Sequence, residues 1–172
     1  MPGTAPGTSV WSRFLTHTDG HNKWYFVSVE PAIDGTGFVL MTAYGPIGSC
    51  HKVDTQMFTY SSAAIAISDA GTKVYEKERK GYRFAGAEPT FAMIARSDPK
   101  RLMKIIGRLA SDAQAMRFLR TLFAGLTDTE MAELSPKDLM PLLKAEQRET
   151  RLAGMAMAAE LASRRKTSGP TQ

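Results

Sequence analysis

Residues 23–44 read KWYFVSVEPAIDGTGFVLMTAY. The segments 23–30 and 38–44 are dense in aromatic and β-branched residues, which is typical of β-strands. Between them, residues 34–37 (Asp-Gly-Thr-Gly) have the composition of a hairpin connection. We therefore expect two paired strands here, and the second is apolar enough to lie inside a sheet.

The neighbouring segments extend this pair into a small sheet. Further extended segments are expected at 11–16, 49–53, 56–60 and 82–84. A helix is expected from Ser61 to about Lys80, because apolar residues recur there at helical spacing. Its expected inner face consists of Ala64, Ile67, Ala70 (or Gly71), Val74 and Tyr75. Gly81 stands where a glycine commonly follows the end of a helix.

The composition changes after Glu88. Twelve of the fifteen aromatic residues precede it, whereas residues 90–165 are rich in Ala, Leu, Met and Arg. Asp98 or Ser97 before Pro99 is a helix start signal. Thr127 and Glu130 have the spacing of a capping box. The fold class expected is therefore α+β, with a twisted antiparallel sheet and one packed helix at 10–86, an all-helical bundle at 90–165, and flexible tails at 1–9 and 166–172.

The last helical stretch has a weak pattern. Residues 144–151 contain no large apolar side chain, so we expect them to be solvated or to touch a charged group. A stripe of apolar residues at helical spacing follows and is expected to face inward. It consists of Leu152, Met155, Ala159 and Ala162.

The charge is concentrated in the second half of the chain. Residues 1–90 carry eight basic and eight acidic side chains, and residues 91–172 carry fourteen basic and nine acidic ones, which gives the net charge of +5. Four basic residues lie on one face of the helix after Pro99, namely Lys100, Arg101, Lys104 and Arg108. Such a stripe is either the solvated face of an amphipathic helix or a surface that contacts phosphates.

Signatures of enzymes and of metal sites are missing from the sequence. One cysteine, Cys50, excludes a disulfide framework and thiol-rich zinc sites. Gly35-x-Gly37 lacks the third glycine of a phosphate-binding loop, and no Gly-x-Ser-x-Gly elbow occurs. We expect a non-enzymatic protein without cofactor or metal. No apolar run reaches the length of a membrane span, so a cytoplasmic location without membrane contact is expected.

One pattern in the second half suggests a helix-turn-helix. Residues 126–134 and 135–140 are two consecutive helical segments. The gap between them is short for the usual turn, and Pro141 interrupts the second segment. A plain helical bundle is the alternative.

Several short motifs of the first half occur in one order. They are Arg13-Phe14, then HNKWYFV at 21–27, YGPIG at 44–48, Phe58 with Ser61 and Ala63-Ala64, and KERKGY at 77–82. In this order and at these distances they resemble the WGR domain, a module of nuclear poly(ADP-ribose) polymerases and of many bacterial proteins. The resemblance does not extend into residues 90–172.

This resemblance implies a twisted antiparallel sheet with one packed helix that binds DNA at a strand break. Carried over by position, the implied contact residues are Asn22, Lys23, Tyr44, Gly45, Gly48, Lys52 and Tyr82. The sequence departs from the family motif at two of its three named positions, because Tyr44 replaces the tryptophan and Pro46 replaces the arginine. Pro46 removes a guanidinium and a backbone N–H.

The function expected is therefore nucleic-acid binding. The predicted interface combines the residues implied by the resemblance with Lys100, Arg101, Lys104 and Arg108, and the predicted partner is DNA with an end or a nick. Tyr44 ends a strand and precedes Gly45, so its ring is expected to be displayed at a sheet edge. Two alternatives stay open: a protein-interaction adaptor that docks a partner enzyme through the WGR-like surface, and a purely structural turn at Gly45–Gly48.

Overall fold

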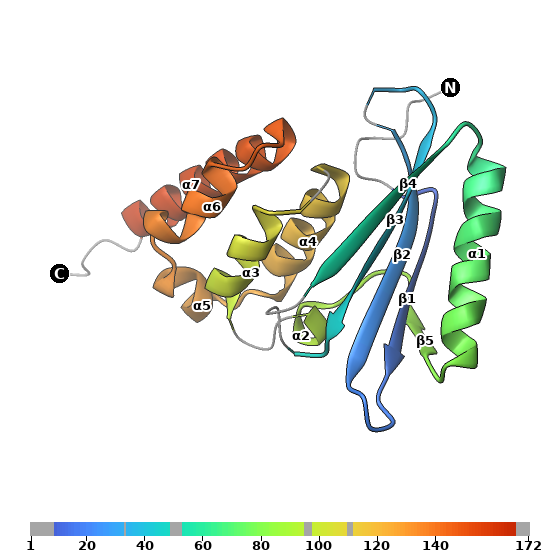
Figure 1. Cartoon of the computed structure of the whole chain (residues 1–172). Coiled ribbons are helices and arrows are strands. Elements are labelled where there is room, and N and C mark those ends of the chain that lie inside the picture. The colour runs from blue at the N-terminus through green and yellow to red at the C-terminus, as the bar shows by residue number, and fades with distance from the viewer. Residues whose placement is uncertain (1–8, 33, 49–52, 95–97, 110–111, 168–172) are drawn as a thin grey trace. The chain divides into compact units, whose positions relative to one another are not determined.

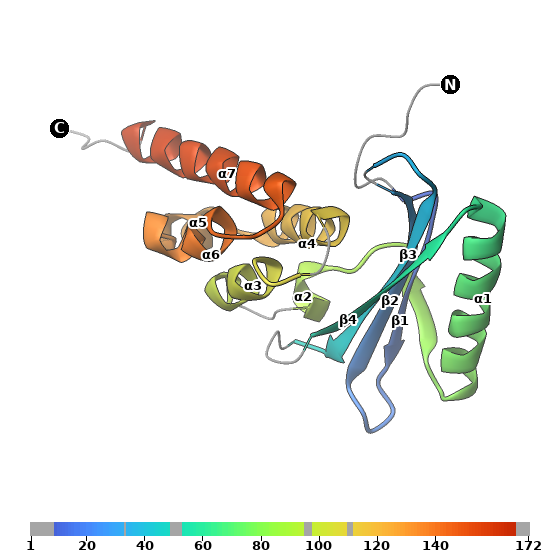
Figure 2. The same cartoon turned by 45° about the horizontal axis from the view of Figure 1, so that its top comes forward.

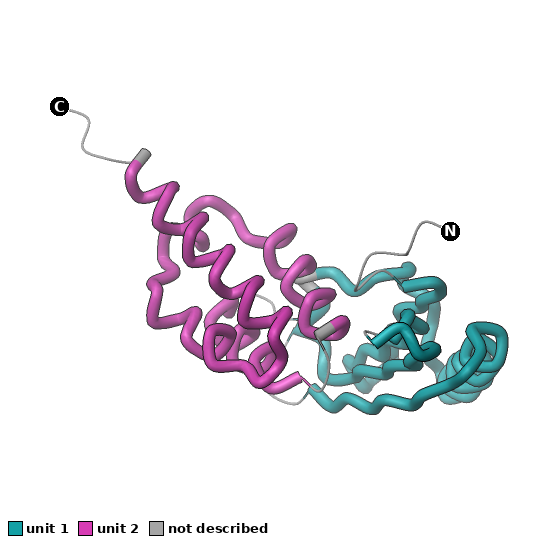
Figure 3. Tube along the Cα trace, turned by 90° about the horizontal axis from the view of Figure 1, so that it is seen from above, with its two compact units in different colours: residues 1–97 teal, residues 98–172 magenta. Residues whose placement is uncertain are grey.

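The computed structural model describes residues 9–32, 34–48, 53–94, 98–109 and 112–167. The chain divides into two compact units, Met1–Ser97 and Asp98–Gln172, shown in two colours in Figure 3. We describe each unit by itself.

The first unit is built on a five-stranded antiparallel sheet (Figure 1). Its strands are β1 (Trp11–His17), β2 (Lys23–Pro31), β3 (Phe38–Pro46), β4 (Asp54–Tyr60) and β5 (Arg83–Gly86). Their order across the sheet is β4-β3-β2-β1-β5, so four consecutive strands form a meander and β5 is added beside β1. The expected strands are thus confirmed, and the segment expected at 49–53 lies, except for Val53, outside the described residues.

The hairpin between β2 and β3 depends on its glycines. Gly37 has a φ of +133°, and a Cβ there would lie 2.4 Å from the Tyr60 carbonyl oxygen. Asp34 accepts hydrogen bonds from the backbone N–H of Thr36 at 2.9 Å and from its hydroxyl at 2.6 Å. This Asx-type bonding favours a turn over continued strand. The hairpin connection expected at 34–37 is confirmed.

Helix α1 (Ala63–Arg79) covers one face of the sheet (Figure 2). It begins after Ser62, one residue later than expected, and ends where Gly81 adopts a φ of +96°. Ala66 and Ala70 are its fully buried residues. Ala64 and Tyr75, expected on the inner face, are exposed instead. These two small side chains allow α1 to approach the sheet closely. The spacing of apolar residues predicts Ala70 on this face but does not predict Ala66.

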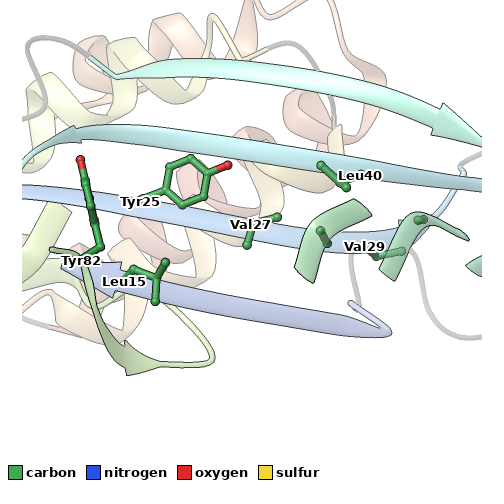
Figure 4. Close-up of a cluster of buried hydrophobic side chains, with 8 residues drawn as sticks. Leu15, Tyr25, Val27, Val29, Leu40 and Tyr82 are labelled. Atoms are coloured by element: carbon green, nitrogen blue, oxygen red, sulfur yellow. The ribbon is translucent and has the colours of Figure 1, made fainter. Parts of the chain in front are cut away.

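The core of this unit lies between α1 and the sheet (Figure 4). Alternate residues of the three central strands supply it, as the period of a strand requires. Its buried members are Leu15, Tyr25, Val27, Val29, Leu40, Ala66, Ala70 and Tyr82. The residues of β2 that face the other way, Trp24, Phe26, Ser28 and Glu30, are buried as well. Burial on both faces explains why β2 is almost continuously apolar.

The second unit is helical. Its elements are α3 (Pro99–Ile106), α4 (Asp112–Gly125), α5 (Asp128–Glu133), the 3₁₀ helix η1 (Pro136–Leu139), α6 (Met140–Leu143) and α7 (Arg148–Thr167). Asp98 caps α3 by accepting the Arg101 N–H at 3.0 Å, and Thr127 forms the expected capping box with Glu130. A short helix α2 (Phe91–Ile94) belongs to the first unit.

The helix-turn-helix alternative is wrong for residues 126–140. After α5, the chain forms only the four-residue η1 and the four-residue α6. Pro136 and Pro141 each stand within the first turn of one of these short elements. Proline starts a helix but does not continue one, so no long recognition helix forms here. The plain helical arrangement holds.

The predicted inner face of α7 is also wrong. Leu152 and Met155 are 46% and 59% exposed, whereas Thr150, Met157 and Leu161 are buried. The reason is Gly154, where a Cβ would lie 2.8 Å from the Leu142 Cβ. Helix α7 thus crosses α6 closely at a residue without a side chain. A pattern of large apolar residues does not mark such a position.

Residues 144–151, which precede and begin α7, are not fully solvated, contrary to expectation. Ala145 and Thr150 are buried. The Gln147 side-chain amide donates to the Leu109 carbonyl. Small and polar residues therefore fill part of the interior in this stretch, which lacks large apolar side chains.

Candidate nucleic-acid interface

The turn between β1 and β2 lies at one end of the sheet, and strand β3 and helix α1 both terminate at that same end (Figure 1). Tyr25 and Tyr44 are directly opposed in the β2–β3 register. Tyr82 follows α1, and its backbone N–H donates to the Lys77 carbonyl at 3.2 Å. This bond folds the chain back over the last turn of the helix. The side chains of Tyr25, Tyr44 and Tyr82 therefore lie together on the α1 face, beside Lys77.

A single lysine lies over three tyrosine rings at this end. The Lys77 Nζ is 4.6 Å from the ring centroid of Tyr25, 5.5 Å from that of Tyr44 and 5.6 Å from that of Tyr82. The Tyr25 ring stacks on Tyr44 at 6.3 Å and meets Tyr82 edge-on at 6.4 Å between centroids. Figure 4 shows Tyr25 and Tyr82 side by side. We call Tyr25, Tyr44, Lys77 and Tyr82 the tyrosine–lysine cluster.

The electrostatics of this cluster favour an anion. Burial lowers the pKa of the Lys77 ammonium, and the nearby ammonium groups of Lys80 and Lys23 lower it further, whereas the Glu76 carboxylate raises it. Burial also raises the pKa of Tyr25 to about 12 and the pKa of Tyr82 above its usual range. The phenols are therefore neutral at neutral pH, and the three lysines repel one another. An anionic group placed among them would relieve that repulsion.

The turn that follows Tyr44 is fixed by hydrogen bonds. The Trp24 indole N–H donates to the Pro46 carbonyl at 3.1 Å, and the Ile47 N–H donates to the Asn22 carbonyl at 2.7 Å. Gly48 has a φ of +72°, a conformation that favours glycine. These bonds give the turn a structural role, and they tie it to the residue that precedes β2.

The comparison with protein families matches residues 9–89 to the WGR domain. Residues 9–89 are a WGR domain. The WGR domain is a module known for nucleic-acid binding. The comparison finds no catalytic domain and assigns no family to the C-terminal region. No curated protein matches the chain.

A protein from Bacteroides fragilis with a crystal structure is similar to part of this chain. The two sequences are 28% identical over 44% of this chain, with a TM-score of 0.36. The match covers 19% of the length of that protein.

Residues of the WGR domain predicted to bind nucleic acid lie mostly together. Tyr44 and Tyr82 belong to the tyrosine–lysine cluster, and Asn22 and Lys23 are exposed where β2 begins. Gly45 is buried opposite Trp24, and Gly48 lies in the fixed turn. Lys52 lies outside the described residues. The roles of these residues in binding stay predictions.

The expected position of Tyr44 is wrong. Strand β3 lies between β2 and β4, so Tyr44 is not at a sheet edge. Its ring is half-buried and packs against the core beneath α1. The edge strand in this part of the sheet is β4.

The sequence pattern does not predict that Tyr25, Lys77 and Lys80 belong to this site. That pattern identifies Tyr25 only as a strand residue, and Lys77 and Lys80 only as part of a motif. The pairing of Tyr25 with Tyr44 would follow from aligning the two strands around the hairpin. The position of Lys77 depends on how α1 crosses the sheet, which the sequence does not show.

The basic residues predicted in the second unit are all exposed. Lys100, Arg101 and Lys104 lie in α3, and Arg108 follows its end. The Lys100 ammonium is 3.8 Å from the Asp138 carboxylate, and Arg101 forms an ion pair with Asp98 at 2.9 Å. This exposure fits both a solvated face and a phosphate-contacting one.

Membrane spans and metal sites are both missing from the described part of the chain. Within it, no helix is both long and apolar enough to cross a membrane. Nor does that part bring three or more His, Cys, Asp or Glu side chains together where a metal ion would bind.

Proposed function

We propose that this protein is a non-enzymatic DNA-binding protein that contacts duplex ends or nicks through the tyrosine–lysine cluster. The observation that carries the proposal is the Lys77 ammonium over three tyrosine rings, with Lys23 and Lys80 close enough to lower its pKa. Aromatic rings combined with positive charge are the usual means of holding the exposed end of a nucleic-acid strand.

Each member of the site has a distinct role in this proposal. Tyr44, half-buried at the end of β3, offers ring surface for stacking against a terminal base or sugar. Lys77 and Lys23 supply charge to the adjacent phosphate. Lys77, in α1, thereby supplies the positive charge that is lost where Pro46 replaces the arginine of the family motif. Tyr82 and Tyr25 hold the Lys77 ammonium in place.

The exposed basic residues of the second unit are proposed to add non-specific affinity. Lys100, Arg101, Lys104 and Arg108 would contact the phosphate backbone without reading its sequence. Backbone contacts of this kind orient a protein on DNA and make its binding sensitive to salt.

The test is a binding titration of the full chain against three DNAs by fluorescence anisotropy. They are a blunt duplex, a nicked duplex and a closed dumbbell of equal length that has no end. We expect tighter binding to the first two than to the dumbbell, with affinity falling as salt rises. Equal binding to all three would contradict end recognition, and no binding at low salt would discard DNA binding.

The residue-level test is Lys77→Met, which keeps the apolar stem over the rings and removes the charge. We expect weaker binding to ends and little change in melting temperature, because the ammonium in the parent protein is partly desolvated. Lys73→Met is the matched control, since Lys73 lies in the same helix with its ammonium 4.4 Å from the Phe58 ring. Equal effects of both changes would show that general charge, not this cluster, matters.

A second candidate function is protein docking. Leu152 and Met155 leave an apolar stripe of α7 exposed, and Ala156, Ala159 and Ala162 continue it. Exposed apolar stripes on a helix favour protein partners. Salt dependence separates the two functions, because apolar docking shows little slope of log K against log salt, whereas each phosphate contact on duplex DNA adds about −0.9.

A further inference from the structure

A row of side chains crosses the sheet from the tyrosine–lysine cluster to the β5 edge. Tyr44 is opposite Tyr25, Tyr25 is opposite Leu15, and Leu15 is opposite Phe84. Directly opposed residues lie on the same face of a sheet. The row therefore runs over β3, β2, β1 and β5 on the α1 face, and it ends at Phe84, whose side chain is 60% exposed.

A second cation lies over the far end of this row. The Arg13 guanidinium carbon is 4.9 Å from the ring centroid of Trp11 and 5.8 Å from that of Phe84. One Arg13 N–H donates to the Ser12 carbonyl at 2.8 Å, which fixes the orientation of the guanidinium. Trp11 is held in turn by packing against the core. The two ends of the row thus share one composition, aromatic rings with a cation above them.

Helix α1 leaves this end of the row open. It packs chiefly on β2, β3 and β4. Two exposed basic residues, Arg79 and Lys80, lie at the end of α1, whereas Arg83 pairs with Thr16 and lies on the other face of β5 from Phe84. Positive charge is therefore present at both ends of the row, from Lys77 and Lys80 at the cluster and from Arg13 at the edge, which favours a nucleic-acid strand over an apolar protein surface as the occupant.

We propose that Phe84, Arg13 and Trp11 form a stacking subsite for an unpaired nucleotide next to the tyrosine–lysine cluster. The inference rests on the proposed function and narrows its substrate class to duplex ends that carry a short single-stranded overhang. The Phe84 ring stacks on a base, and the stacked Arg13 guanidinium donates to a phosphate. Stacking of this kind is tolerant of sequence, because every base has a π-face.

The spacing of the strands sets the length of that overhang. Three strand-to-strand steps of about 4.8 Å separate Tyr44 from Phe84, or about 14 Å. At the spacing of a duplex strand, about 3.4 Å per nucleotide, this distance corresponds to about four nucleotides. An overhang of one nucleotide would not reach Phe84, and one of four would.

The experiment compares a blunt duplex with the same duplex carrying a four-thymidine overhang, using the full chain and fluorescence anisotropy. We expect the parent protein to bind the overhang more tightly. Phe84→Ala should reduce affinity for the overhang by about 5- to 150-fold, the range given for one stacked base, and leave affinity for the blunt end unchanged. Phe84→Trp should restore overhang binding.

Phe58→Ala is the matched control, because Phe58 also carries a cation over its ring but lies on β4 at the opposite edge of the sheet. It should leave both affinities unchanged. Equal parental affinity for blunt and overhang DNA overturns the subsite while the proposed function stands. Loss of both affinities in Phe84→Ala, with a lowered melting temperature, assigns Phe84 a structural role and overturns the subsite too. Absence of parental binding to either duplex overturns the proposed function itself.

Discussion

At the scale of single residues, a cation still lies beside Tyr44 although Pro46 replaces the arginine of the family motif. Pro46 supplies no charge, yet the Lys77 ammonium lies 5.5 Å from the Tyr44 ring centroid, beside the motif position. Pro46 has a role of its own, because its carbonyl accepts the Trp24 indole N–H. That bond uses only the backbone, so it does not depend on the side chain at position 46.

The first prediction concerns this motif. Tyr44→Ala should weaken binding to duplex ends by about 1–3 kcal/mol, the range for one stacked base. Because Tyr44 is only half-buried, the loss of stability should be smaller than the roughly 3–5 kcal/mol typical of a fully buried aromatic. Tyr44→Trp should preserve binding, and Pro46→Arg should strengthen it by adding a phosphate donor. Anisotropy and thermal melting on the same variants measure both effects.

A result in which Tyr44→Ala melts early and binds normally would assign Tyr44 to the core alone. Weaker binding of Pro46→Arg would show that the turn tolerates no long side chain.

The second prediction uses the tyrosine pKa values. Burial raises that of Tyr25 to about 12, and the hydrogen bond to Asp69 raises that of Tyr60 to about 12. A raised pKa stabilises the folded state while both states are neutral, and this stability is lost as pH rises from about 10 through about 12. Absorbance at the phenolate band should show these two tyrosines ionising late, with stability falling above a pH of about 10. Phe replacements identify each step, and ionisation of Tyr25 at its ordinary pKa in the folded protein would contradict its burial.

At the scale of elements, the sequence predicts most of the architecture but misplaces helix faces. Strands β2 and β3 follow from their aromatic and β-branched composition, and the capping box of α5 follows from its spacing. In α1, Ile67, Ala70 and Val74 lie against the core as expected, whereas Ala66 joins them and Ala64 and Tyr75 do not. In α7, the close contact with α6 is made at Gly154. Apolar periodicity registers large side chains and overlooks small residues such as Ala66 and Gly154.

The sequence also predicts only part of the candidate site. Asn22, Lys23, Tyr44 and Tyr82 follow from the family resemblance, because their motifs are local in sequence. Lys77 reaches the site only through the angle at which α1 crosses the sheet, a property of tertiary packing.

The third prediction tests close packing in the helical unit. A Cβ at Gly107, just after α3, would lie 2.5 Å from the Pro141 carbonyl oxygen of α6. Gly107→Ala should therefore destabilise the protein by about 1–3 kcal/mol, the usual cost of overpacking. Gly71→Ala is the control, because nothing lies within 4 Å of a Cβ there. It should stabilise α1 by about 0.5–1 kcal/mol, since alanine favours a helix over glycine. Chemical denaturation measures both, and equal stability of the two variants would contradict the α3–α6 contact.

At the scale of the whole molecule, the uneven charge of the chain follows its division into two compact units. The predicted domain bounds, 10–86 and 90–165, place the excess of basic residues in the helical domain and the aromatic site in the WGR domain. Under the proposed function, end recognition belongs to the WGR domain and general phosphate affinity to the helical domain. The two contributions differ in their response to salt, because stacking depends little on ionic strength and counterion release depends on it strongly.

The last prediction tests this division of labour. Replacing Lys100, Arg101, Lys104 and Arg108 together by Gln should flatten the slope of log K against log salt by about 0.9 for each phosphate that the variant no longer neutralises. Preference for ends over the closed dumbbell should persist, because it resides in the WGR domain. Exposed ion pairs such as Arg101–Asp98 contribute about 0–1 kcal/mol, so melting should change little. Lys137→Gln with Lys144→Gln removes two exposed lysines outside the stripe and is the control. A collapse of folding would show that the stripe is structural, and a slope equal to that of the parent would place the phosphate contacts elsewhere.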